Sequence, residues 1–228
     1  MIELEHVTRA YGEGHAAVKA LDDATLSVNE GEFVVVLGPS GSGKTTLLNI
    51  VGALDTPTSG SVTVAGRDIT HANRGELSAV RRHTVSFIFQ GFNLFPGLTA
   101  RENVQFAIDA AGRREGPSAG DVLESVGLGD RKDQFPSQLS GGEQQRVAIA
   151  RSLVGNPHVV LADEPTGALD TRTGEEVMGI LGGLVREHGI TVILVTHEQS
   201  VADHADRIVR MRDGKVVEDA RRKVWAVS

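Results

Sequence analysis

The chain has 228 residues, no cysteine, and 30 acidic against 23 basic side chains, which gives a formal net charge of −7. Without cysteine it has no disulfides and no thiolate metal ligands, which fits a cytoplasmic location. The acidic balance argues against a general nucleic-acid-binding protein, whose surface would be basic. The N-terminal residues lack the runs of a signal peptide, and no apolar run approaches the ~20 residues that cross a bilayer. We therefore expect one soluble domain, 1–228, that reaches a membrane only through a partner.

The N-terminal residues are rich in strand patterns. Residues 2–7 alternate apolar and polar side chains, which predicts an edge strand with one face in water. Residues 18–28 predict further strand with a turn near Asp22-Asp23. Tyr11, the only tyrosine, lies in the predicted loop between them. Its ring is suited to stacking on an adenine, and a tyrosine that packs at a strand end is the ordinary alternative.

The next stretch matches the G-x-x-x-x-G-K-[ST] phosphate loop. Its members are Gly38, Pro39, Ser40, Gly41, Ser42, Gly43, Lys44, Thr45 and Thr46. A buried-strand pattern at 33–37 precedes it and a helical pattern at 47–51 follows, so a glycine-rich turn with a chance lysine is disfavoured. Strand, loop and helix direct backbone N–H groups and the helix dipole at one point, which suits a polyphosphate. We expect Lys44 to reach the β- and γ-phosphates of a nucleoside triphosphate and Thr45 to bind Mg²⁺.

A turn cluster at 55–60 separates this unit from a predicted hairpin, which comprises 61–64 and the segment after Gly66. Residues 85–89 predict another strand, and it ends at Gln90. An open α/β sheet presents ligand-facing groups at the carboxyl ends of its strands. Gln90 is therefore a candidate, although by itself it is equally compatible with a solvated strand end.

The pattern from residue 92 to 156 is helical and contains no strand-like segment. Capping boxes and closing glycines predict three helices there, at 99–111, at 121–126 and from Ser140 to about Val154. This run therefore predicts a helical lobe that is inserted into the α/β core.

The third of these helices begins at Ser140-Gly141-Gly142, and Glu143 completes its capping box. Two glycines in a first turn weaken a helix. They also leave its N-terminal N–H groups uncovered, so we expect a second anion site at this helix start.

Residues 159–162 predict a buried central strand, and Asp163 and Glu164 stand at its carboxyl end. We expect Asp163 to hold Mg²⁺, usually through water, and Glu164 to polarise the attacking water. A pair of exposed acids after a strand is the ordinary alternative, and the phosphate loop in the same chain disfavours it.

A last set of strands and a helix follows. Asp170 precedes a helix for which Thr171 is the predicted cap. Residues 191–196 predict a strand with His197 at its end, beside the strand ends that carry Gln90 and Asp163. This position makes His197 a candidate γ-phosphate contact.

The chain closes with a predicted hairpin around Asp213-Gly214, formed by 206–211 and 215–218. The basic residues Arg221-Arg222-Lys223 are expected to be a solvated terminus, with a contact to a polar lipid or a partner as the alternative.

Together these motifs are similar to those of the nucleotide-binding subunit of an ABC transporter, over nearly the whole chain. The matching segments are Walker A at 38–45, the Q-loop at Gln90, the LSGGQ-type signature at 139–144, Walker B at 159–164, the D-loop at 168–170 and the switch histidine at His197. Tyr11 falls where the family has its adenine-stacking aromatic residue. The signature and the phosphate loop together are specific, because few other P-loop proteins carry both.

Finer features resemble one branch of that family, the lipoprotein-releasing and macrolide-exporting ATPases that pair with an FtsX-like permease. These features lie in 48–60, 87–94 and 162–170. The signature has Glu143 where many relatives have Gln, a variant that is common in this branch. Gly167 stands where Ser is frequent, which is a mild departure.

The resemblance implies an α/β fold of the P-loop NTPase (ABC ATPase) class, with a mixed-sheet core, an N-terminal antiparallel β subdomain and an inserted α-helical subdomain. The core would comprise 1–91 and 157–228, and the helical subdomain 92–156. The implied catalytic residues are Glu164, His197, Gln90 and Lys44. The implied ATP-binding residues are Tyr11, Gly38 to Thr46, Ser140, Gly141, Gly142 and Asp170, and the implied metal ligands are Thr45, Gln90 and Asp163.

The resemblance also implies partners. Two copies would face head to tail, so that Ser140 and Gly142 of one protomer cover the γ-phosphate held by Lys44 of the other. With ATP and Mg²⁺ as cofactors, hydrolysis would power a separate FtsX-like permease, in an exporter or a system that extrudes lipoproteins, peptides or drugs. The expected location is the inner face of the cell membrane, and no nucleic acid is expected as a partner.

Two alternatives come from other functional classes. An ABC-type ATPase acting on DNA or ribosomes would carry a long coiled-coil insertion or two cassettes in one chain, and this sequence has neither. A regulatory ATPase that controls a membrane-linked cell-wall process through an FtsX-like partner would use the same cassette. The sequence does not separate that second alternative from export.

Overall fold

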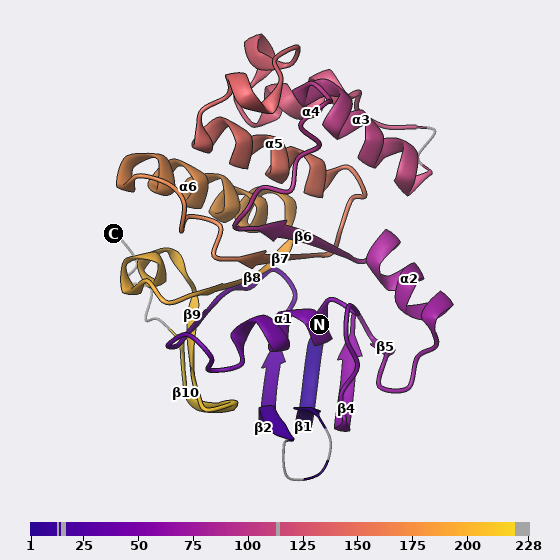
Figure 1. Cartoon of the computed structure of the whole chain (residues 1–228), viewed down its shortest axis with the longest axis vertical. Helices are drawn as coiled ribbons and strands as arrows, with labels where there is room; N and C mark the ends of the chain where they lie inside the picture. Colours follow the sequence, from indigo (N-terminus) through magenta and orange to yellow (C-terminus); the bar gives the residue numbers. More distant parts are fainter. Residues whose placement is uncertain (13, 15–16, 113–114, 222–228) are drawn as a thin grey trace.

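The computed structural model describes residues 1–12, 14, 17–112 and 115–221, and Figure 1 shows their arrangement. The strands are β1 (Ile2–Tyr11), β2 (Val18–Val28), β3 (Phe33–Leu37), β4 (Ser59–Val64), β5 (Arg67–Asp68), β6 (Val85–Phe89), β7 (Val159–Asp163), β8 (Thr191–Thr196), β9 (Arg207–Arg212) and β10 (Lys215–Arg221). The helices are α1 (Lys44–Val51), α2 (Arg74–His83), α3 (Ala100–Ala111), α4 (Ala119–Ser125), α5 (Gly141–Leu153) and α6 (Thr171–His188), with short 3₁₀ turns η2 (Gly129–Arg131), η3 (Pro136–Gln138) and η4 (Gln199–His204).

The core of the molecule is a six-stranded sheet in the order β10-β9-β3-β8-β7-β6. Its strands β6, β7, β8, β3 and β9 run parallel, and β10 pairs with β9 antiparallel. Every residue of β3 and β8 is buried. β3 is apolar throughout and β8 is apolar between its terminal threonines, because helices or a second sheet cover each face of a parallel sheet. The predicted strands at 33–37, 85–89, 159–162 and 191–196 and the predicted final hairpin are confirmed.

A smaller antiparallel sheet, in the order β2-β1-β4-β5, lies on one side of this core (Figure 1). Its apolar residues share a hydrophobic core with α1 and with one face of the large sheet. The other face of the large sheet packs against α5 and α6, and α3 and α4 lie beyond α5. The helices α1 and α5 therefore cover opposite faces of the same sheet.

The structure corrects three local predictions. The first strand, β1, is not an edge strand, because it pairs with β2 on one side and with β4 on the other. No turn interrupts β2 at Asp22-Asp23. Instead, Asp23 has a φ of 58° where the β1–β2 register shifts, which is the behaviour of a β-bulge. The cap of α6 is Asp170, whose side chain accepts from Thr173, and Thr171 is the first helical residue.

Helix α2 was not among the elements predicted from the sequence. This helix buries only Val80 completely, with Leu77 partly buried beside it, and most of its residues are polar, so its apolar pattern is short. Its capping box, formed by Asn73 and Glu76, was the available signal.

Between residues 92 and 156 the described part of the chain is helical, with α3, α4, η2, η3 and α5 and no strand. Capping boxes start the three α-helices, as predicted at Thr99 and Ser140 and in addition at Ser118. Within the described ranges, no helix combines the length and the apolar character that crossing a membrane requires.

Candidate functional site

The parallel strands of the core sheet bring most of the predicted site residues to one edge. Leu37 at the end of β3 is level with Thr196 at the end of β8, and Asp163 at the end of β7 is level with Phe89 at the end of β6. The phosphate loop, His197, Glu164 and Gln90 follow directly after these four strands. Residues from four separate parts of the sequence therefore lie at the carboxyl edge of one sheet, where open α/β folds bind ligands.

Two glycines give the phosphate loop its backbone path. Gly41 has a φ of 79° and Gly43 a φ of 98°, a region that other residues rarely adopt. A Cβ on Gly43 would lie 2.3 Å from the carbonyl oxygen of Ala20, so no side chain fits there. Gly43 is also the N-cap of α1, and no side chain caps the helix. The first N–H groups of α1 therefore remain available to an anion.

Lys44 lies inside the loop, with 6% of its surface exposed. Its Nζ donates hydrogen bonds to the carbonyl oxygens of Gly38 and Pro39, at 2.8 and 2.9 Å. Burial lowers the pKa of Lys44, and the carboxylates of Glu164 and Asp163 act in the opposite direction. The ammonium group thus has polar carbonyl partners but no direct ion pair, which suits it to a phosphate.

The loop also contains an unpaired polar atom. Among the described side chains, the hydroxyl of Ser42 is buried and has no hydrogen-bond partner. A buried hydroxyl without a partner costs roughly 1–3 kcal/mol, so such an atom calls for an explanation. Its position inside the phosphate loop makes a bound phosphate oxygen a suitable partner.

Thr45 and Asp163 provide neighbouring oxygen atoms from two elements. Oγ1 of Thr45, in the first turn of α1, is 3.4 Å from Oδ1 of Asp163 at the end of β7. In the described ranges, no cluster of three or more His, Cys, Asp or Glu side chains could hold a metal by itself. One carboxylate, one hydroxyl and phosphate oxygens are a donor set that suits Mg²⁺, which rarely has an all-protein cage.

Burial raises the pKa of Asp163, and the neighbouring Glu164 also raises it, whereas the hydrogen bond from Thr45 and the charge of Lys44 lower it. Because the folded-state pKa lies above the unfolded value, the ionised carboxylate weakens folding at neutral pH. This penalty is absent at pH values below the unfolded pKa and is complete above the folded pKa.

Replacing Asp163 by Asn should therefore raise the melting temperature of the nucleotide-free protein at pH 7. We expect a rise of roughly 2–4 °C, which corresponds to about 1 kcal/mol in a protein of this size. The gain should shrink as the pH falls toward 4, because the wild-type carboxylate becomes protonated. Thermal unfolding at several pH values measures both effects. A gain that is equal at pH 4 and pH 7, or a loss at pH 7, would contradict this account.

Glu164 and His197 form a pair at the strand ends. Oε1 of Glu164 is 2.9 Å from Nδ1 of His197, and the backbone N–H of Glu164 donates to the carbonyl of Val195 on the neighbouring strand. Glu164 has a φ of 45°, an unusual value for a residue with a side chain. The strained backbone of Glu164, held by β8, therefore directs its carboxylate toward the histidine.

Gln90 lies close to the same carboxylate. A Cβ on Gly167 would be 2.9 Å from Nε2 of Gln90 and 3.4 Å from Oε2 of Glu164. Both side chains therefore lie against Gly167. The glycine at this position, which departs from the family's frequent serine, leaves them room.

The predicted signature residues do not join this cluster. Ser140 caps α5, and its hydroxyl donates to Oε2 of Glu143 at 2.8 Å, while the N–H of Glu143 donates back at 3.3 Å. The helix α5 packs on the opposite face of the sheet from α1. Ser140, Gly141 and Gly142 therefore start a helix that lies across the sheet from the helix that follows the phosphate loop.

Tyr11 and Asp170 lie outside the cluster at the carboxyl edge of the core sheet. Tyr11 ends β1, its hydroxyl donates to Oδ2 of Asp55 at 2.7 Å, and the guanidinium of Arg9 lies 4.6 Å from the centre of its ring. The ring remains 42% exposed, so it is accessible to a flat ligand. Asp170 is occupied as the cap of α6, where Thr173 donates to both of its carboxylate oxygens.

Arg151 of α5 was not among the predicted site residues. This guanidinium donates to the backbone carbonyl oxygens of Phe92 and Asn93, both of which have positive φ. These two residues follow Gln90 closely, so Arg151 ties the segment after Gln90 to α5. An arginine on the apolar face of a predicted helix was the only sequence signal, and its acceptors are backbone atoms that no sequence pattern reveals.

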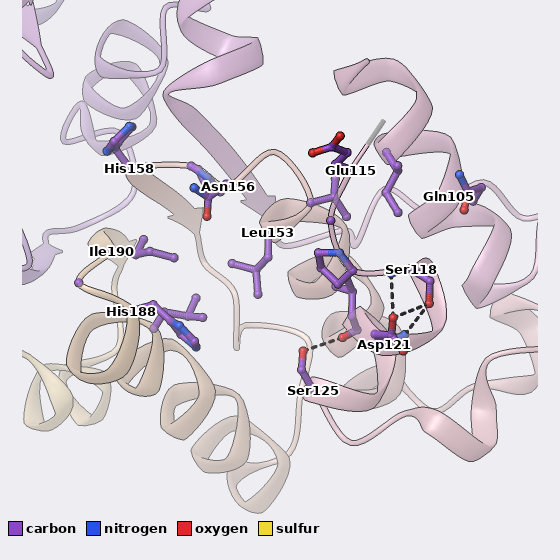
Figure 2. A pocket seen from close by; sticks show the side chains of 18 of the residues that line it. Gln105, Glu115, Ser118, Asp121, Ser125, Leu153, Asn156, His158, His188 and Ile190 are labelled. Carbon is purple, nitrogen blue, oxygen red and sulfur yellow. Dashed lines mark hydrogen bonds between the residues drawn. The ribbon is translucent and has the colours of Figure 1, made fainter. Parts of the chain in front are cut away.

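A cavity of about 690 Å³ opens at another place (Figure 2). It is lined by His158 and Ile190, which precede β7 and β8, and by Glu115, Asp121 and Ser125 of the helical part. His158 and Ile190 mark the amino ends of β7 and β8, opposite the phosphate loop. Since ligands of open α/β sheets bind at the carboxyl ends, this cavity is not the candidate nucleotide site.

The comparisons with known proteins agree with this geometry. The family model described as ABC transporter matches residues 21–167. An ABC transporter ATP-binding protein of Methanocaldococcus jannaschii is 50% identical over 96% of this chain and 98% of its own length. The macrolide export ATP-binding/permease protein MacB of Rhodopirellula baltica is 48% identical over all of this chain. The chain spans only 34% of that MacB protein.

Among solved structures, the chain is similar to the ATP-binding cassette MJ0796 in a dimeric post-hydrolysis state bound to ADP and Pi. The TM-score is 0.88 and the sequence identity 43%, and the match covers 97% of this chain and 98% of the other. A second dimeric structure of the same bacterial ABC transporter cassette also has a TM-score of 0.88, with 44% identity and the same coverage. The predicted fold class is thus confirmed. The family model covers the central motifs, one relative is 50% identical over nearly its whole length, and the solved structures have the same fold. The chain therefore belongs to the ABC transporter family, as an ATP-binding cassette.

Proposed function

We propose that this cassette binds and hydrolyses ATP to power a separate membrane permease. The observation that carries this proposal is the Glu164–His197 pair, which stands at the same sheet edge as Lys44 and the open N-terminus of α1. A carboxylate that can orient water, beside a site built for polyphosphate, is the arrangement that phosphoanhydride hydrolysis requires.

The phosphate loop would hold the triphosphate. Backbone N–H groups of Ser40 to Thr46, which include the N-terminus of α1, would surround the phosphates, and the hydroxyl of Ser42 would gain its missing partner. Lys44 would exchange its carbonyl partners for the β- and γ-phosphates. The exposed ring of Tyr11 would stack on the adenine, with Arg9 on the same ring.

Thr45 and Asp163 would hold Mg²⁺, and Gln90 would complete the protein ligands. When bound, Mg²⁺ neutralises charge on the β- and γ-phosphates. Glu164 would align or deprotonate the attacking water, and His197 would hold Glu164 in place and contact the γ-phosphate. Asp163 and Glu164 stand at the end of β7, Gln90 follows β6 and His197 follows β8, so the sheet itself sets the spacing of these side chains.

The second half of the site would come from another copy of the chain. Ser140, Gly141 and Gly142 start a helix on the opposite face of the sheet from α1, so one protomer does not bring them to its own phosphate loop. Two protomers related head to tail would place each signature turn against the other's ATP, with Asp170 at the contact between them. The similar cassette MJ0796 is itself dimeric in its post-hydrolysis state with ADP and Pi bound, which supports such an assembly.

The permease would dock beside Gln90. A groove of about 490 Å³ between β6 and α3 is lined by Phe87, Phe89, Phe95 and Phe106, with Arg81 and Arg82 at its margin. Phe95 and Phe106 are about half exposed, and their rings pack edge to face at 4.8 Å. Exposed aromatic patches of this kind mark protein contact sites. An amphipathic helix of an FtsX-like permease with an acidic end would fit, and it would hold the cassette at the inner face of the membrane.

The regulation of a cell-wall process through a similar permease uses the same cassette, and no contact in the described residues favours it over export. The relatives named as macrolide export proteins combine ATP-binding and permease functions in one chain. That naming supports a permease as the partner of this cassette. The permease would then select the transported substrate.

Changing Phe106 to Asp should break the permease contact. The charge would enter an aromatic groove, and we expect the amount of co-purifying integral membrane protein to fall by at least about tenfold, equivalent to 1.4 kcal/mol. Affinity purification of the tagged full chain from host membranes, followed by mass spectrometry, measures this. Val217→Asp is the matched control, because Val217 is 57% exposed on β10. Equal recovery of a permease with both variants would show that the groove is not the docking site.

A further inference from the structure

Helices α5 and α6 are neighbours within one chain (Figure 1), and their first turns meet at Gly142 and Thr173. A Cβ on Gly142 would lie 2.1 Å from Cγ2 of Thr173, far inside the roughly 3.5–4.0 Å at which carbon atoms make contact. A Cβ on Gly141 would lie 3.3 Å from Cδ2 of Leu169. Residues 169–173 therefore pack so closely against the two signature glycines that a side chain at Gly142 would clash and one at Gly141 would be tightly packed.

Thr173 is held in place from its other side. Its N–H donates to Oδ1 of Asp170 at 3.1 Å, and its hydroxyl donates to Oδ2 at 2.6 Å. Hydrogen bonds to the ionised form lower the pKa of Asp170, so both are charge-assisted at neutral pH. The hydroxyl and the methyl group of a threonine share one Cβ, so the bond to Asp170 also fixes the direction of the methyl group.

We propose that Thr173 is a positioning residue for the ATP site of the opposite protomer. Its hydroxyl ties it to Asp170, and its methyl group sets the position of Gly142 at the start of α5. This contact therefore places Ser140 and Gly142 where they can bind the γ-phosphate that the opposite protomer holds. The inference rests on the proposed ATP-dependent dimer, and Thr173 itself touches no nucleotide.

The chain allows the two halves of this role to be separated. Thr173→Ser keeps the hydroxyl and removes the methyl group, whereas Thr173→Val keeps a methyl group and removes the hydroxyl. Thr171→Ser is the matched control, since Thr171 is an exposed residue in the same helical turn. The affinity for Mg-ADP reports the phosphate-loop half of the site alone. ATP-driven dimerisation in a Glu164→Gln background, and kcat in the Glu164 protein, report the completed site.

For both Thr173 variants we expect Mg-ADP affinity within about twofold of the parent. We expect kcat and the dimer association constant to fall about 10- to 100-fold, as a small misplacement of a catalytic group does. The Thr171→Ser control should match the parent in all three measurements. A Thr173→Ser protein with the parent's kcat, or one whose loss is accounted for by weaker Mg-ADP binding, would overturn the proposal.

A second variant tests the contact itself. Ala at position 142 would overlap the Thr173 methyl group, and Ser at 173 would leave Cβ of residue 173, at 3.5 Å, as the nearest atom. Gly142→Ala with Thr173→Ser should therefore dimerise at least about tenfold better than Gly142→Ala alone, while Gly142→Ala with Thr171→Ser should not. Losses that simply add in the Thr173 double variant would show that this contact does not set the geometry.

The failure of this inference is distinguishable from failure of the proposed function. If the Glu164→Gln protein with Thr173 intact forms no dimer with ATP, the paired-site function is wrong whatever Thr173 does. If that protein does dimerise and Thr173→Ser is neutral, only the role of Thr173 is wrong.

Discussion

Glu164→Gln is expected to keep ATP binding, to lower ATP turnover by about 10²–10⁴-fold and to accumulate as a closed dimer. Glutamine has the same shape and can still bond to His197, so the strand-end geometry should persist. It cannot accept a proton from water, so ATP would remain in the shared site and hold the two protomers together. Size-exclusion chromatography with and without ATP, together with steady-state turnover, measures both effects.

Glu187→Gln is the control for this experiment, because Glu187 is an exposed carboxylate near the far end of α6. It should hydrolyse ATP at the parent rate and dimerise only transiently. A Glu164→Gln protein that turns over ATP as fast as the parent would remove Glu164 from the reaction. In that case the pair with His197 would be structural only.

Lys44→Ala is the second change with a large expected effect. It removes the cation that the loop positions with two carbonyl hydrogen bonds, together with its charge-assisted bonds to phosphate. Bonds of that kind are worth about 1.5–3 kcal/mol each, so we expect nucleotide affinity or turnover to fall by at least about 100-fold. Titration with a fluorescent ATP analogue and steady-state kinetics separate the two.

Lys132→Ala is the matched control for this change. Lys132 is a partly exposed lysine at the end of the 3₁₀ turn η2, in the helical part of the chain and outside the phosphate loop. It should leave ATP affinity and turnover within about twofold of the parent. If Lys44→Ala matched it in both measurements, the phosphate-loop assignment would be wrong.

Local patterns predicted the parts of the fold that depend on burial and capping. The strands at 33–37, 159–162 and 191–196 were recognisable because a parallel strand covered on both faces is a nearly continuous apolar run. The helix starts at Thr99 and Ser140 were recognisable because a capping box is a contact between residues three apart.

The same reasoning failed where the answer depended on a neighbour. Alternation along β1 reports that one face is wet, but it does not report how many strands pair with it, so β1 was wrongly placed at an edge. The bulge at Asp23 and a turn have the same polar, turn-forming composition. The helix α2 was missed because it is mostly polar and buries only one residue completely, so its apolar stripe is short.

The sequence by itself determined that the chain carries a phosphate loop, two carboxylates after a buried strand and a glycine-fronted helix start, because each of these is a short run of neighbouring residues. Only the tertiary structure decided that Glu164 meets His197, that Arg151 holds the segment after Gln90, and that Thr173 meets Gly142. Those contacts join residues 31 to 59 positions apart, and the contacts of Arg151 are made with backbone atoms. Sequence patterns record local periodicity and capping, whereas such contacts exist only after the sheet has brought its strand ends and the facing helices together.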